Sequence, residues 1–153
     1  MSKPTDIENA LGRARHYCAF QDRCIKELSD KLIGWKVKPA DAKKVIEQMQ
    51  EEGYINEERF ARAYASGRFR LKHWGKTRIT YELKGKGIPD ELIKLALEEI
   101  DEEEYKEALH HLLVKKNKEI NEEDDFLRKK KLVSYALGKG YEYPVVKEVL
   151  ERV

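Results

Sequence analysis

The most constraining feature of this 153-residue sequence is a pattern that occurs three times. In the middle of the chain, apolar residues with helical spacing are followed by two glycines and a proline, in the order Ile79, Leu83, Gly85, Gly87, Pro89. The pattern returns 53 positions later as Leu132, Ala136, Gly138 and Gly140, followed by Pro144. A weaker copy 51 positions earlier has Leu28, Leu32 and Gly34, but Lys36 replaces the second glycine. Self-similarity at a period of about fifty residues predicts stacked helical units, each too small to bury its apolar face alone.

Helical signals dominate each unit. Apolar residues three or four positions apart predict helices over 7–20, 23–34 and 39–52 in the first unit, and no segment shows the period of two that is typical of a strand. The sequence therefore predicts an all-α fold of three tandem three-helix repeats that form an elongated, curved helical array. We place the repeats at 1–55, 56–102 and 103–153, with joints at 53–56 and 101–104.

Prolines and polar residues predict where helices begin. Pro39, Pro89 and Pro144 each fall at the start of an expected helix, where the missing N–H is harmless. Asn56 is expected to cap the helix that follows it. Residues 117–125 are expected to form a polar connection before a helix that begins near Asp124.

Glycines predict how helices end. Gly53 and Gly87 each follow a helical pattern and are expected to adopt the left-handed conformation that ends a helix. Gly140 occupies the position equivalent to Gly87 in the third repeat. Lys36 occupies this position in the first repeat, so we expect that turn to form differently or to hold Lys36 at a strained backbone angle.

Charge is distributed unevenly along the chain, although its formal net charge is only +2. Residues 57–88 hold nine Lys and Arg against three Glu, whereas residues 89–125 hold five Lys against fourteen acids. A basic face of this kind is either solvated or in contact with an anionic partner, and the clustering favours contact. The candidate partner-binding residues are Arg59, Arg62, Arg68, Arg70, Lys72, Lys76, Arg78, Lys86, Lys129, Lys130 and Lys131.

Aromatic and sulfur side chains are better explained by packing than by chemistry. Trp35, Phe69, Trp74 and Tyr81 lie near these charges in the sequence and could add contact surface, but core positions are the favoured interpretation. Cys18 and Cys24 are interpreted as buried structural thiols on one helix, in preference to a redox or metal site.

The sequence shows no motif for catalysis or cofactor binding. Gly75-Lys76-Thr77 resembles the end of a phosphate-binding loop, but Arg70 stands where that loop needs its first glycine. His110 and His111 are adjacent and point about 100° apart on a helix, which suits neither zinc binding nor a catalytic dyad. No nucleophile lies beside a base in a recognisable motif. We therefore predict a protein that is not an enzyme and has no cofactor or metal.

The sequence also predicts a location. It contains no apolar run of about 18 residues, the length that spans a bilayer, and its N-terminal residues lack the basic-then-apolar profile of a secretory signal. We expect a cytoplasmic protein without membrane contact.

Two motifs carry a resemblance to a known family. The first reads Gly-Tyr-Ile-Asn-Glu-Glu-Arg-Phe-Ala from Gly53 to Ala61, and the second places Gly75, Arg78, Glu82, Leu83 and Gly87 between Lys72 and Ile88. With this spacing, the sequence resembles the RecX family of bacterial recombination regulators over roughly residues 8–150. It departs from the family pattern at Asn56, where Asp is usual, at Lys36, where glycine is expected, and at Ala136, a place more often leucine.

The resemblance implies an all-α protein of three three-helix repeats that acts in DNA repair, recombination and the SOS response. It implies binding to the RecA recombinase filament and inhibition of its ATPase, strand-exchange and filament-extension activity, by a protein that we expect to be a monomer. Some members of the family also touch DNA, so single- or double-stranded DNA is a further candidate partner.

Two other functions stay open: a nonspecific nucleic-acid-binding helical-repeat protein, and a helical scaffold for unrelated partners. The acids that follow the basic segment favour a protein partner, because a surface of mixed charge can pair with both signs whereas DNA cannot.

Overall fold

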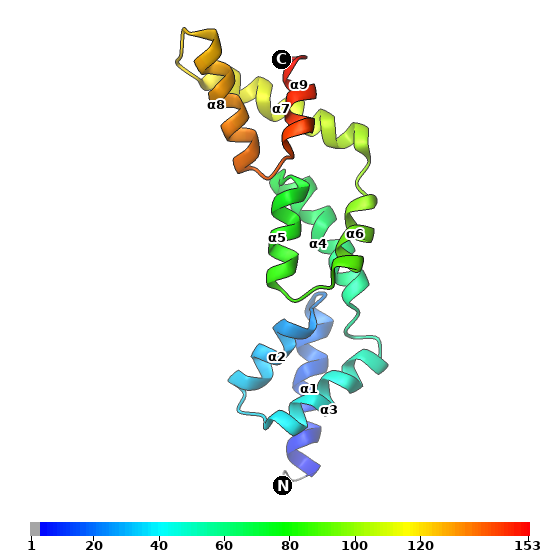
Figure 1. Cartoon of the computed structure of the whole chain (residues 1–153). Coiled ribbons are helices and arrows are strands. Elements are labelled where there is room, and N and C mark those ends of the chain that lie inside the picture. Colours follow the sequence, from blue (N-terminus) through cyan, green and yellow to red (C-terminus); the bar gives the residue numbers. More distant parts are fainter. Residues whose placement is uncertain (1–3) are drawn as a thin grey trace. The chain divides into compact units, whose positions relative to one another are not determined.

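All the regular structure described in this protein is helical. The computed structural model describes residues 4–153, with side chains from residue 6 onward (Figure 1); the first three residues of the predicted first repeat lie outside the described residues. Within this range are α1 (Pro4–Phe20), α2 (Ile25–Gly34), α3 (Pro39–Glu51), α4 (Glu57–Lys72), α5 (Lys76–Gly85), α6 (Asp90–Glu98), α7 (Glu102–Glu119), α8 (Asp125–Gly138) and α9 (Tyr143–Leu150). The all-α prediction is confirmed, and α1 to α3 lie close to their predicted bounds.

The chain divides into two compact units. The first comprises residues 1–63 and 83–93, and the second comprises residues 64–82 and 94–153. The division passes through α4, α5 and α6. The three repeat boundaries given above stay a prediction.

In the first unit, α1, α2 and α3 pack against one another around a small apolar core. Leu28 and Leu32, one helical turn apart on α2, are completely buried. Cys18 and Cys24 are buried free thiols, as predicted, and burial raises the pKa of both, that of Cys24 to about 11. They do not share a helix, however, because α1 ends at Phe20 and Cys24 is the residue that precedes α2.

In the second unit, α7, α8 and α9 pack against one another. Their buried faces contain two large aromatic residues, Tyr105 of α7 and Tyr141 of the turn before α9, whose ring centroids are 4.9 Å apart. Phe69 of α4 is also buried, 5.7 Å from the Tyr105 ring. Its core position was predicted. The other core residues of these three helices are Leu109, Leu113, Leu132, Ala136, Val146 and Val149.

The predicted helix starts are largely confirmed. Pro39 begins α3 and Pro144 is the second residue of α9, whereas Pro89 lies just before α6 and its carbonyl accepts the Ile93 N–H at 3.1 Å. The Asn56 side chain accepts the Arg59 N–H at 3.0 Å, which caps α4.

One predicted connection is shorter than expected. The Asp124 side chain caps α8 by accepting the Leu127 N–H, as predicted, but α7 continues to Glu119. The connection is therefore residues 120–124 and not 117–125. No glycine or proline interrupts the helical run before Glu119, so nothing in its backbone ends the helix earlier.

The left-handed turns are confirmed. Gly53, Gly87 and Gly140 have φ values of +81°, +76° and +99°. Lys36 has a φ of 62°, so the first repeat forms the same turn with a strained residue. The hydrogen bonds agree: the N–H groups of Val37, Ile88 and Tyr141 reach back to the carbonyls of Leu32, Leu83 and Ala136 at 3.0–3.1 Å. The alignment of the three repeats thus holds at the level of backbone geometry.

We predict that Gly87→Val costs more than roughly 1 kcal/mol of stability, because a β-branched side chain is poorly tolerated at positive φ. A Cβ on Gly87 would meet no atom within 4 Å, so the cost would come from the backbone alone. Urea unfolding of the variant and the parent measures the difference. A valine variant as stable as the parent would contradict the assignment.

Two glycines of the second unit approach each other closely. Gly75, just before α5, donates its N–H to the Lys139 carbonyl at 2.8 Å, and Thr77 donates to the Gly140 carbonyl at 2.9 Å. A Cβ on Gly75 would overlap the Gly140 backbone, and a Cβ on Gly140 would overlap Arg78. The start of α5 therefore docks on the turn between α8 and α9, with backbone against backbone.

We predict that Gly75→Ala destabilises the protein by about 2 kcal/mol or more, because the added methyl forces the two backbones apart. Gly67→Ala is the matched control: Gly67 lies within α4, where a Cβ would meet nothing within 4 Å, and alanine there should be neutral or stabilising by up to about 1 kcal/mol. Thermal unfolding compares the two variants, and equal effects would disprove the close docking.

Candidate partner-binding surface

The turn from α4 to α5 positions the first part of the candidate surface. His73 directly follows the last residue of α4 and has a φ of 58°, and its N–H donates to the Phe69 carbonyl at 3.0 Å. The next residue, Trp74, donates its N–H to the Arg68 carbonyl at 3.2 Å. The left-handed His73 thus folds the half-buried Trp74 side chain back towards the end of α4. The sequence analysis did not predict this left-handed residue, because positive φ is uncommon for any residue other than glycine.

Two arginines lie against the Trp74 ring. The Arg78 guanidinium carbon is 4.2 Å from the ring centroid, and that of Arg68 is 5.5 Å away. Arg68 also lies 4.4 Å from the ring centroid of Tyr64, which is one turn earlier on α4. Such contacts hold a guanidinium over an aromatic face. We call Tyr64, Arg68, Trp74 and Arg78 the Trp74 cluster.

Further cations surround the Trp74 cluster. Lys72 is exposed, and its backbone carbonyl accepts a hydrogen bond from the Lys139 ammonium at 3.4 Å. Within the described residues, no carboxylate forms an ion pair with Arg68, Lys72, Arg78 or Lys139. The cluster is therefore a surface with uncompensated positive charge, suited to an anionic partner.

Acidic residues of α7 border this surface. Lys76 pairs with Glu102 at 3.1 Å and lies 4.7 Å from the Tyr105 ring centroid, and its side chain is only 17% exposed. Arg70 approaches Glu104 at 3.9 Å. Both carboxylates belong to the first turn of α7, where negative charge is favoured by the helix dipole. The basic surface thus has an acidic edge.

The candidate partner-binding residues of the first unit form hydrogen bonds and ion pairs with other residues of the chain. Arg59 donates to the Asp22 carboxylate at 2.7 Å and to the carbonyls of Gly53 and Tyr54 at 3.1 Å. Arg62 pairs with Glu58 at 2.9 Å, and Lys86 with Glu27 at 3.3 Å. These three cations therefore form ion pairs within the first unit.

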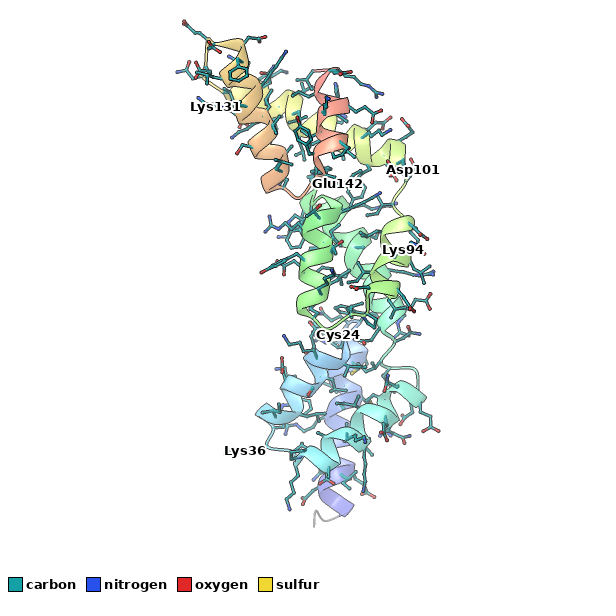
Figure 2. The ribbon with its side chains drawn as sticks, in the orientation of Figure 1. Cys24, Lys36, Lys94, Asp101, Lys131 and Glu142 are labelled. Atoms are coloured by element: carbon teal, nitrogen blue, oxygen red, sulfur yellow. The ribbon has the colours of Figure 1, made fainter. Side chains whose placement is uncertain are left out.

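Two lysines of the α8 triplet are compensated by nearby carboxylates. Lys129 pairs with Asp125 at 3.8 Å and Lys131 with Glu122 at 3.3 Å, while Lys130 lies 5.2 Å from the Phe126 ring centroid. The acids come from the same segment, just before or at the start of the helix. Figure 2 shows Lys131 on α8, in the second unit.

The sequence analysis misplaced one aromatic residue, Tyr81, and missed two residues of the surface, Tyr64 and Lys139. Tyr81 is 76% exposed, so its predicted core position is wrong: it lies on the outer face of α5, two residues from the buried Ile79 and Leu83. Trp35 and Trp74 are half-buried. Tyr64 was not predicted, although its spacing of four from Arg68 is a usable signal. Lys139 was also missed, although it is equivalent to Lys86 in the repeat.

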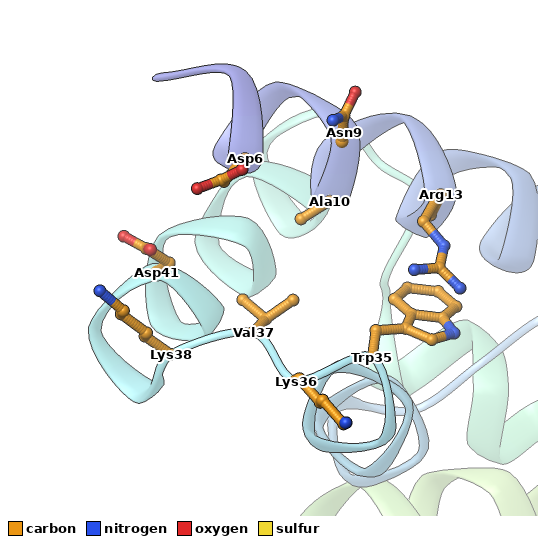
Figure 3. A pocket seen from close by; sticks show the side chains of 9 residues that line it. All are labelled: Asp6, Asn9, Ala10, Arg13, Trp35, Lys36, Val37, Lys38 and Asp41. Carbon is orange, nitrogen blue, oxygen red and sulfur yellow. The ribbon is translucent and has the colours of Figure 1, made fainter. Parts of the chain in front are cut away.

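A separate pocket of about 250 Å³ lies in the first unit (Figure 3). There the Arg13 guanidinium stacks on the Trp35 ring, 4.3 Å from its centroid. The lining includes two acidic and three basic side chains, so no single ligand charge is selected, and we assign the pocket no function. Its lining is Asp6, Asn9, Ala10, Arg13, Trp35, Lys36, Val37, Lys38 and Asp41.

Among the residues that the structure describes, none of the helices combines the length and the apolar character needed to cross a membrane.

Comparison with protein-family models gives two matches. The second three-helix domain of RecX matches residues 56–97, and the third three-helix domain of RecX matches residues 102–150. Together these matches cover more than half of the chain. They confirm the prediction of tandem three-helix domains.

Similarity to individual RecX proteins agrees with the family-model matches. The chain is 33% identical over 132 residues to the regulatory protein RecX of Clostridium acetobutylicum, covering 84% of this chain but 56% of that protein. It is 27% identical to the regulatory protein RecX of Prosthecochloris aestuarii, covering 97% of this chain and 96% of that protein. The crystal structure of RecX from Lactobacillus salivarius superposes with a TM-score of 0.90 at 22% identity, over 98% of this chain and 97% of the other. The last comparison supports the fold.

We predict that Arg59→Ala and Lys72→Ala separate structural from surface cations. Arg59→Ala should lose about 1–2 kcal/mol of stability, because it removes charged hydrogen bonds to three acceptors, whereas the exposed Lys72→Ala should change stability by no more than about 0.5 kcal/mol. Urea unfolding measures both. If the two variants were equally stable, the distinction drawn here would fail.

Proposed function

The chain belongs to the RecX family of regulatory proteins, and we propose that it binds the RecA recombinase filament and inhibits its ATPase, strand-exchange and filament-extension activities. Family membership is the observation that carries the proposal. The chain spans 56% of the length of the Clostridium acetobutylicum relative, so the activity is proposed for the three-helix domains present here.

The Trp74 cluster supports a binding role. It presents positive charge that no carboxylate of the described residues neutralises, on a part of the chain that matches the second three-helix domain of RecX. We infer that Arg68, Lys72 and Arg78 make the central contacts with the filament. Arg70 and Lys76 lie at the acidic edge of the same surface, while Arg59, Arg62 and Lys86 support the fold.

Binding alone accounts for the proposed inhibition. A protein lodged on a growing filament obstructs the addition of protomers beyond that point, and it needs no catalytic step of its own. We further propose a cytoplasmic monomer whose repeats are 1–55, 56–102 and 103–153. The alternative is a nonspecific nucleic-acid-binding protein that uses the same cations, including the lysine triplet of α8.

We predict that the protein inhibits DNA-dependent ATP hydrolysis by RecA at less than one molecule per RecA protomer, because obstruction at one point stops growth past it. Steady-state hydrolysis measured over a range of ratios tests this. Absence of inhibition at every ratio would overturn the proposed function.

A charge-reversed variant locates the contact. Arg68→Glu, Arg70→Glu and Lys72→Glu together should weaken inhibition. A matched control reverses Lys38, Lys43 and Lys44, which are exposed lysines of the first unit outside the candidate set, with the same change in net charge. Both variants should melt close to the parent, since exposed charges add little stability and the half-buried Arg68 loses only its contacts with the Tyr64 and Trp74 rings. Direct DNA binding that falls steeply with salt and is lost together with inhibition would favour the alternative function.

A further inference from the structure

We propose that Arg68 and Arg78, both held against the Trp74 ring, form a two-arginine clamp that binds carboxylates on a protein surface of mixed charge. The clamp deepens the proposed function, because it assigns the chemistry by which the RecA filament would be recognised at this surface.

The clamp is preorganised. Each guanidinium lies over an aromatic ring, Arg78 at 4.2 Å from the Trp74 centroid and Arg68 at 4.4 Å from the Tyr64 centroid. Within the described residues, neither side chain donates a hydrogen bond or forms an ion pair. The planar N–H donors stay available while the rings restrict the side chains, which lowers the entropy lost on binding.

The ring faces argue against a base-stacking role for the cluster. Proteins that bind single strands commonly offer open aromatic faces to bases. In the Trp74 cluster, both the Tyr64 and the Trp74 ring already have a guanidinium over them. The groups that the Arg68 and Arg78 side chains leave without a hydrogen-bond or ion-pair partner among the described residues are two guanidinium forks, whose geometry matches carboxylates and phosphates.

The acidic edge argues for a protein partner. Glu102 and Glu104 are tied to Lys76 and Arg70, at the border of the same surface. A nucleic-acid backbone that crossed the clamp would gain little from Lys76 and Arg70, because these carboxylates already compensate their charges. A protein surface with carboxylates for the clamp and cations for this edge pairs with both.

The decisive variant is Arg68→Lys with Arg78→Lys, which keeps the charge and removes the forks. Trp74→Leu removes the ring and keeps both arginines, while Trp74→Phe keeps an aromatic face. The matched control is Arg13→Lys, because Arg13 makes the same kind of stack, 4.3 Å from the Trp35 centroid in the first unit. Binding to RecA filaments, inhibition of the RecA ATPase and melting temperature are measured for each.

We expect the double lysine variant to bind the filament at least about tenfold more weakly than the parent, because lysine cannot replace a bidentate arginine contact. Trp74→Leu should weaken binding as well, whereas Trp74→Phe and Arg13→Lys should stay close to the parent. Melting temperatures should be similar. A double lysine variant that binds the filament as the parent does would overturn the clamp while leaving the proposed function intact.

A second measurement does not depend on RecA. The chain has two tryptophans, so Trp35→Phe leaves Trp74 as the only indole fluorophore. Addition of a glutamate-rich peptide at low salt should change the fluorescence of Trp74. Arg68→Lys with Arg78→Lys in the Trp35→Phe background should reduce that change. An oligothymidylate probe tests the exposed Tyr81, one turn from Arg78 on α5, as a stacking site. A response to the oligothymidylate but not to the peptide would overturn the clamp in favour of nucleic acid.

Discussion

The docking of α5 on the turn between α8 and α9 is the contact on which the second unit depends. The first N–H groups of a helix have no partner within it and need one from outside. Around the start of α5, the Lys139 and Gly140 carbonyls accept the N–H groups of Gly75 and Thr77, and the Tyr105 hydroxyl accepts that of Lys76. Tyr105 in turn donates to Glu142, and both its burial and this hydrogen bond raise its pKa. The hydroxyl thus stays protonated and able to donate.

This docking also places the candidate surface. Trp74 directly precedes Gly75, and the Tyr141 hydroxyl donates to the His73 carbonyl at 3.1 Å, so the turn that carries Trp74 is also held by the α8–α9 turn. A Cβ on Gly140 would overlap the Cβ of Arg78, which means that the absence of a side chain at position 140 is what lets Arg78 lie where it does. Gly140 therefore serves both the docking of α5 and the position of Arg78 in the candidate surface.

Local signals made the turns predictable, and distant partners limited the prediction of the surface. The left-handed Gly53, Gly87 and Gly140 follow from residues within one turn of each. Arg59 and Arg78, by contrast, look alike in the sequence. What separates them is Asp22, which lies 37 residues from Arg59 and becomes its partner only in the folded chain. The exposed Tyr81 shows the same limit, since its short helix has apolar residues close on both sides.

The start of α2 in the first unit is equivalent in the repeat to the start of α5 in the second unit. The two starts make different kinds of contact, although they share one sequence pattern. There the start of α2 meets the α5–α6 turn through side chains: Lys26 reaches the Gly85 carbonyl at 3.0 Å, and Glu27 pairs with Lys86 at 3.3 Å. A Cβ on Gly87 would meet open space, so Cys24 is accommodated where the second unit requires Gly75. The contact formed by backbone hydrogen bonds, with a glycine on each side, is the one beside the Trp74 cluster. The backbone that carries the proposed clamp is therefore positioned by main-chain groups, whose geometry depends less on side-chain rotamers than that of an ion pair.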